Sequence, residues 1–217
     1  MKKVTYAILF FLSSSEHVIC WHTEPQNNTS QNVTQLQEII IGNPKAPNTI
    51  IVYISFTCSH CRDFCKETLP ELKKKYANTG KASIYIRFFL DDLGSLDATL
   101  LVRCLGSHQD EILNLAAKIF EEQDEWKKSS DPRAFLIKNI EKSNYRIGDI
   151  KRCLTNEPLK KNLEDAHTIV AKEIHLIPAF VINGKVHQGK IDVEKIDQML
   201  FSKRKAINIK NNTLNRL

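Results

Sequence analysis

Short segments rich in apolar and β-branched residues, bounded by turn residues, predict β-strands along this chain. In residues 81–89, for example, Ile84, Ile86 and Phe88 recur at every second position and define one face of a strand. An Asn-Gly pair at Asn183 and Gly184 separates two further segments and predicts a hairpin turn. The expected strands cover residues 38–41, 49–56, 81–89, 179–182 and 185–188.

Elsewhere apolar residues recur every three to four positions, which predicts helices. A helix expected at residues 59–77 directly follows the strand 49–56, and Pro70 should kink or break it. Five more helices are expected before the hairpin and one after it, at residues 96–105, 111–127, 132–142, 147–154, 159–174 and 193–202. The pattern describes one α/β domain, residues 38–202, with a helical insertion at about 96–174.

Composition and charge fit a soluble globular protein. The chain has 217 residues, 42% of them hydrophobic and 26% charged, enough for one domain with a sizeable core. The net charge is +6, but Lys2, Lys3 and five basic residues in the tail 203–217 account for seven positive charges, which leaves −1 for residues 4–202. The charge therefore gives no support for nucleic-acid binding.

The N-terminus has the pattern of a secretory signal. Lys2 and Lys3 precede an apolar run at residues 7–12 that is too short to cross a bilayer. We assign residues 1–20 to the signal, with cleavage near Cys20; an earlier cut, a retained anchor or a lipid on Cys20 are the alternatives. Residues 21–37 are polar and read as a linker.

Cys58 and Cys61 form a C-x-x-C motif at the junction between the strand 49–56 and the helix 59–77. Unpaired N–H groups and the helix dipole at this junction favour an ionised first thiol. A thiolate with a second thiol in reach can open a disulfide in a partner and then close its own. A second feature lies at Ile177 and Pro178, where a proline opens an apolar strand and an X-Pro bond can be cis.

Together these motifs resemble the thioredoxin-fold, DsbA-type thiol–disulfide oxidoreductases of bacteria. The resemblance rests on residues 42–47, the Cys58–Cys61 motif, Ile177-Pro178 and residues 180–185, and it covers about residues 38–202. It implies a thioredoxin fold with an inserted helical subdomain, a periplasmic location, exported unfolded or partly folded protein substrates and a membrane redox partner. The redox-active disulfide implies no external cofactor and no metal.

The resemblance also implies roles for residues around the cysteines. Cys58 would be the nucleophile and Cys61 the resolving thiol. His60 would stabilise the thiolate, and Pro178 would be a cis-proline facing the disulfide. Ile177 would contact the substrate peptide.

Phe56 and Thr57 are expected beside Ile177 as further peptide contacts. Two positions depart from the family pattern. Ser59 replaces a common proline, and Val52 stands where relatives often bury a carboxylate, so the sequence identifies no proton acceptor for Cys61.

Three other cysteines follow the motif. Cys65 lies on the same helix face as Cys58 and Cys61, and we interpret it as a buried free thiol. A third thiol able to intercept Cys61 is the alternative. Cys104 and Cys153 fall in the helical insertion, and export favours their pairing as a structural disulfide.

Three other functions are compatible with these residues. The three neighbouring thiols and His60 could form a zinc-binding module, although no second C-x-x-C completes the site. An oligomeric isomerase or reductase would need an N-terminal extension that builds an oligomer. The linker 21–37 has no heptads, so we favour a monomeric oxidase. A purely structural domain is the third alternative.

Overall fold

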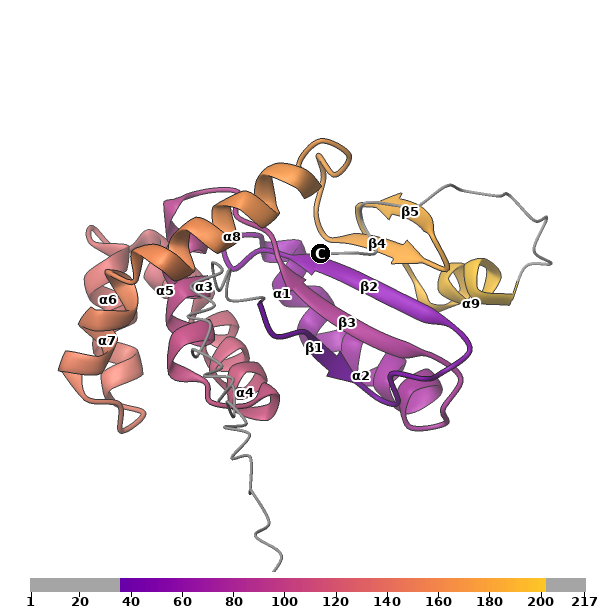
Figure 1. Ribbon diagram of the computed structural model, residues 1–217, viewed down its shortest axis with the longest axis horizontal. Coiled ribbons are helices and arrows are strands. Elements are labelled where there is room, and N and C mark those ends of the chain that lie inside the picture. The colour runs from indigo at the N-terminus through magenta and orange to yellow at the C-terminus, as the bar shows by residue number, and fades with distance from the viewer. Residues whose placement is uncertain (1–35, 202–217) are drawn as a thin grey trace, which may run out of the picture. The chain divides into compact units, whose positions relative to one another are not determined.

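The structure is a computed structural model that describes residues 36–201. Five strands form one sheet in the order β1-β3-β2-β4-β5 (Figure 1). Strand β2 is central, parallel to β3 and antiparallel to β4, and β1 and β5 pair antiparallel at the two edges. The strands are β1 Ile39–Ile41, β2 Thr49–Ile54, β3 Ser83–Phe88, β4 Ala179–Ile182 and β5 Lys185–Gln188.

Helices lie between the strands β2 and β3 and the strands β3 and β4, and one helix follows β5, in the order expected from the sequence. The predicted α/β fold, a thioredoxin fold with an inserted helical subdomain, is confirmed. The predicted signal 1–20, nearly all of the linker 21–37 and the tail 203–217 lie outside the described residues. The helical elements are α1 Ser59–Asp63, η1 Phe64–Thr68, α2 Leu69–Leu72, η2 Lys73–Ala77, α3 Leu93–Leu105, α4 Gln109–Glu121, α5 Gln123–Lys128, α6 Pro132–Glu141, α7 Ile147–Leu154, α8 Glu157–Val170 and α9 Val193–Phe201.

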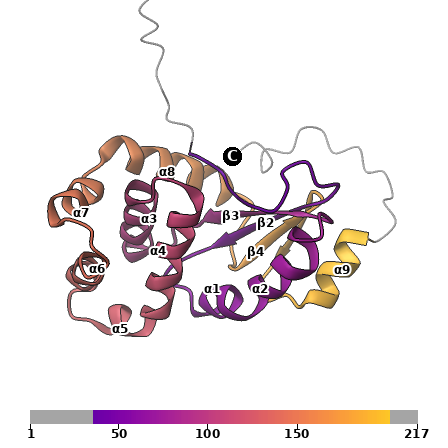
Figure 2. The same cartoon turned by 90° about the horizontal axis from the view of Figure 1, so that it is seen from below.

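The two faces of the sheet pack against different helices (Figure 2). Alternate residues of β2, such as Val52, join the main core with residues of α1, α2 and α9, which lie on one face. The intervening residues Ile51 and Tyr53 form a smaller cluster on the other face with Val170 at the end of α8. Because β2 is packed on both faces, its carboxyl end has a defined position, and this fixes where the following turn begins.

A cavity of about 950 Å³ lies on the second face, between the sheet and α8. Tyr53 and Arg87 line it from the sheet, and Leu163 and His167 from α8. No cysteine within residues 36–201 lines this cavity, and neither Cys58 nor Cys61 contributes to it.

The helix expected at 59–77 follows a modified path. The chain stays helical throughout, but it alternates between α-helical and π-helical turns, with the π-helical segments η1 and η2 on either side of α2. Pro70 lies in the first turn of α2. A π-helical turn next to it accommodates a residue that has no N–H to donate, so the expected break at Pro70 is absent.

The prediction of a single helix at 111–127 is wrong. The backbone leaves the helical conformation at Glu122, which has φ −98° and ψ 13°, and this separates α4 from α5. Residues 121–125 are all polar and contain neither Gly nor Pro, so no local pattern marks the break. The break directs the short helix α5 toward the turn that carries Cys58.

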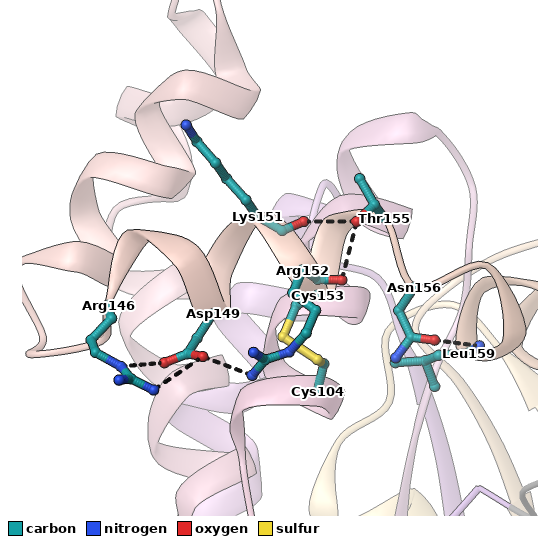
Figure 3. The surroundings of a disulfide bond; sticks show 9 residues. All are labelled: Cys104, Arg146, Asp149, Lys151, Arg152, Cys153, Thr155, Asn156 and Leu159. Atoms are coloured by element: carbon teal, nitrogen blue, oxygen red, sulfur yellow. Dashed lines mark hydrogen bonds and ion pairs between the residues drawn. A yellow bond between two sulfur atoms is a disulfide. The ribbon is translucent and has the colours of Figure 1, made fainter.

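Cys104 and Cys153, which the sequence analysis paired, are joined by a disulfide (Figure 3). Their Cα atoms are 5.5 Å apart, and the bond links the end of α3 to α7. Asp149 forms ion pairs with Arg146 and Arg152 on the exposed side of α7. No helix within residues 36–201 has both the length and the apolar character needed to cross a membrane.

We predict that replacing both Cys104 and Cys153 by Ala lowers the free energy of unfolding by up to about 4 kcal/mol. The disulfide closes a loop whose ends are 49 residues apart, and its loss restores chain entropy to the unfolded state. Urea denaturation of the wild type and the double variant measures the difference. The single variant Cys104→Ala should match the double variant, and a wild-type midpoint in both would contradict the prediction.

Candidate active site

Cys58 lies at the start of α1, where it is the N-cap residue. Its backbone is extended, with φ −85° and ψ 117°, and its carbonyl accepts the N–H groups of Cys61 at 3.1 Å and Arg62 at 3.2 Å. The Cys58 thiol is partly exposed, whereas Cys61 is fully buried. The first thiol can therefore meet a partner protein, and the second can meet only the first.

The two thiols have opposite shifts in pKa. The thiol of Cys61 donates a hydrogen bond to Cys58, and this is the largest cause that lowers the pKa of Cys58 to about 6. The backbone N–H groups of Cys61 and His60 and the charge of His60 add to it, and partial burial opposes it. The same hydrogen bond and burial raise the pKa of Cys61. At neutral pH the pair therefore holds one thiolate, on Cys58, and one thiol, on Cys61.

The loop before β4 closes the site on its other side. The Ile177–Pro178 peptide bond is cis. The Cys58 thiol donates to the Ile177 carbonyl over 3.7 Å, and the Pro178 carbonyl accepts the N–H of Gly189 at 2.8 Å. Leu176, just before this loop segment, is 57% exposed. Ile177, and with it the cis-proline loop, thus lies beside Cys58, the expected nucleophile.

Phe56 does not have the position that we expected. Its side chain is 0% exposed, and its ring stacks against Phe88 and Phe120, with centroids 4.8 and 4.9 Å away. The prediction that Phe56 contacts a substrate peptide is wrong, because it is a core residue. Thr57 is half-buried at the surface, and His60 is exposed on α1.

A polar network that the sequence analysis missed holds the turn before Cys58. Thr57 donates its hydroxyl to Asp91 at 2.9 Å, and the buried Ser55 hydroxyl contacts Asp91 and, at 3.0 Å, Ser95. Val52, where relatives often have a carboxylate, is a buried core residue. One signal was available: Ser55 and Asp91 follow two strands that are now seen to be parallel, whose carboxyl ends share one sheet edge.

Cys65 is a third free thiol on the same helical segment, in η1. Burial raises its pKa to about 12, so it stays protonated at neutral pH and is a poor nucleophile. Cys65 is thus a free thiol, as expected, but it is partly rather than fully buried against the core. Among residues 36–201, no group of three or more His, Cys, Asp or Glu side chains is arranged to hold a metal ion.

Comparison with known proteins identifies the family. The family model described as Thioredoxin matches residues 34–201. The chain belongs to the thioredoxin family. Within it, a Rickettsia conorii protein provisionally named protein-disulfide oxidoreductase is 32% identical over 161 residues, which are 73% of this chain and 57% of that protein. The Rickettsia prowazekii counterpart is 32% identical over 149 residues, 68% of this chain and 54% of its own.

Solved structures confirm the resemblance to DsbA-type members of the thioredoxin family. Wolbachia pipientis alpha-DsbA1 has a TM-score of 0.67 at 25% identity, over 78% of this chain and 95% of its own. A protein-disulfide isomerase from Novosphingobium aromaticivorans has a TM-score of 0.63 at 21% identity, over 72% of this chain and 92% of its own. At this identity, the similarity to the Novosphingobium protein shows only that the two chains share a fold. The chain spans little more than half the length of the Rickettsia proteins.

We predict that the thiolate absorbance of the reduced protein titrates with a midpoint near pH 6, the lowered pKa of Cys58. The absorbance should be nearly complete at neutral pH and disappear as the pH falls below the midpoint. Iodoacetamide at neutral pH should then modify Cys58 and leave Cys61 unmodified, which mass spectrometry of a digest reports. A midpoint above pH 8, or equal modification of the two thiols, would refute the assignment.

A second prediction concerns His60. The change His60→Ala should raise the titration midpoint of Cys58, because it removes a positive charge close to the thiolate. It should also make the disulfide a weaker oxidant in equilibrium with glutathione, since the reduced form loses stabilisation. Ser59→Ala is the matched control, an exposed neighbour without charge. If His60→Ala behaves like this control, the helix N-terminus and the hydrogen bond from Cys61 alone lower the pKa of Cys58.

Proposed function

We propose that this chain is a protein thiol–disulfide oxidoreductase that acts through the Cys58–Cys61 pair, in the oxidising direction on exported proteins. The observation that carries the proposal is the position of a low-pKa, partly exposed Cys58 between a buried Cys61 and the Ile177 carbonyl. The family and the names of its Rickettsia relatives support the same chemistry.

The oxidising reaction has two steps. A substrate thiolate attacks the Cys58 sulfur of the Cys58–Cys61 disulfide, the S–S bond breaks, and Cys61 leaves and takes up a proton. A second substrate thiolate then attacks the substrate sulfur of the mixed disulfide, which forms the substrate disulfide and releases Cys58 as a thiolate. The substrate loses two electrons and the chain gains them. A leaving thiolate with a lowered pKa departs readily, and this favours oxidation.

Ile177 and Pro178 are proposed to bind the substrate next to the reacting sulfur. The Ile177 carbonyl lies within reach of Cys58, so an extended peptide entering the site would pass along this loop. His60 and Thr57 border the same opening as exposed or half-buried side chains. We propose a periplasmic location after removal of residues 1–20, and reoxidation by a membrane redox partner.

Two alternatives lead to different outcomes. An oligomeric isomerase or reductase would rearrange or reduce disulfides in a scrambled substrate faster than it oxidises a reduced one. A zinc module would copurify with zinc. The oxidase proposal expects rapid oxidation of reduced ribonuclease A, a monomer in solution and no bound zinc.

We predict that Cys58→Ser abolishes oxidation of reduced ribonuclease A, because substrate thiolates then have no disulfide to attack. Cys61→Ser should also lose net oxidation, but its Cys58 thiolate should accumulate as a mixed disulfide when supplied with a substrate protein that carries a disulfide, since the Cys61 thiol that would attack the Cys58 sulfur and release the substrate is missing. Nonreducing gels and mass spectrometry detect the intermediate. Trapping by Cys58→Ser but not by Cys61→Ser would reverse the two roles and overturn the assignment.

A further inference from the structure

Helix α5 of the helical insertion contacts the backbone of the turn that carries Cys58. Gln123 donates from Nε2 to the carbonyls of Phe56, at 2.8 Å, and Cys58, at 3.0 Å. The Lys127 ammonium group donates to the carbonyl between them, that of Thr57. Two side chains of one short helix therefore bind three successive carbonyl groups.

Gln123 is an unusual residue for a protein core. Its side chain is 0% exposed, and its Oε1 has no hydrogen-bond partner within residues 36–201. A buried amide with one unpaired group is less favourable than an apolar side chain of the same size. Stability alone does not explain Gln123, whereas its two donated hydrogen bonds to the turn before α1 do.

The helix that carries Gln123 is itself anchored. Trp126 is 1% exposed and donates its indole N–H to the Ile119 carbonyl at 3.1 Å. On the opposite side Asp124 pairs with Arg62 of α1 at 2.7 Å. These contacts fix α5 to both α4 and α1, so its donors meet the turn in a defined position.

We propose that Gln123 and Lys127 are positioning residues of the redox site, through which the helical insertion sets the reactivity of the Cys58 thiol. The inference rests on the proposed function and adds two residues from outside the thioredoxin-like core to it. Gln123 holds the carbonyls on both sides of Thr57 away from the sulfur. Lys127 places a positive charge on the peptide group that joins Thr57 to Cys58, where it favours a thiolate over a thiol.

The effect of Lys127 on the Cys58 thiolate must be distinguished from the effects of other charged groups near the site. The charge of His60 on α1 lowers the pKa of Cys58. Of the two carboxylates, Asp124 is paired with Arg62 and Asp91 is hydrogen-bonded to Thr57. Lys127 is exposed, so its side chain can be changed without disturbing the core.

The test compares Lys127→Met with Lys128→Met, which removes the same charge from the next, equally exposed position of α5. Lys127→Met should shift the equilibrium with glutathione about threefold toward the disulfide form and raise the thiolate titration midpoint by about half a unit. Lys128→Met should leave both at the wild-type value. Lys127→Arg, which keeps the positive charge, should leave both quantities close to the wild-type value. The difference should shrink in high salt, as screening of an exposed charge requires.

Gln123→Met tests the other contact, because it keeps the side-chain size and removes the donor. It should slow attack of Cys58 on a dithiol–disulfide probe at least threefold when compared at equal thiolate fraction, while the oxidised form remains folded by circular dichroism. If Gln123→Met does not fold, the lysine pair alone decides. Equal behaviour of Lys127→Met and Lys128→Met overturns the inference; a wild type that titrates as expected but exchanges no disulfides overturns the proposed function instead.

Discussion

The backbone turn between β2 and α1 is the constraint on which the site depends. Cys58 must be exposed enough to meet a protein partner and also held at the helix N-terminus where its thiolate is stabilised. Exposure alone would leave it mobile. The turn is fixed on one side by β2, which is buried on both faces, and on the other by α1, whose first N–H groups bond to the Cys58 carbonyl. Asp91, in the loop after β3, and Gln123, in the helical insertion, complete this support.

The asymmetry of the two thiols follows from this arrangement. At neutral pH the two sulfur atoms share one proton. The hydrogen bond between them and the burial of Cys61 keep this proton on Cys61. The lowered pKa of Cys58 stabilises the reduced, folded form, fully so above the pKa of an unperturbed thiol near 8.5 and no longer once the pH falls below about 6. Since the disulfide form gains nothing from it, this stabilisation makes the disulfide more oxidising across the neutral range. Cys65 lies on the same helical segment, but it is a partly buried thiol whose pKa desolvation raises, so it does not take part in this sharing of a proton.

The sequence predicted the strands, the helical insertion and the C-x-x-C junction because each has a local pattern. It failed where position depends on packing. In the apolar run that ends at Phe56, hydrophobicity does not show which side chains face solvent, since neither face of β2 is polar. Gln123 lies at the break after Glu122, within the all-polar residues 121–125, and nothing in this run indicates a buried side chain. Its partners are backbone carbonyls, which have no sequence signature.

The helical insertion has one covalent link within itself and one set of hydrogen bonds to the thioredoxin-like core. The Cys104–Cys153 disulfide joins α3 to α7 within the insertion, away from the exposed thiol at Cys58. The hydrogen bonds of α5 cross from the insertion to the redox turn. The Cys104–Cys153 disulfide keeps the insertion folded and so preserves the orientation of α5. In turn, α5 holds the turn that carries Cys58 only while the insertion stays packed. The protein can therefore use one disulfide for stability and another for exchange, because only the second involves a partly exposed cysteine with a lowered pKa.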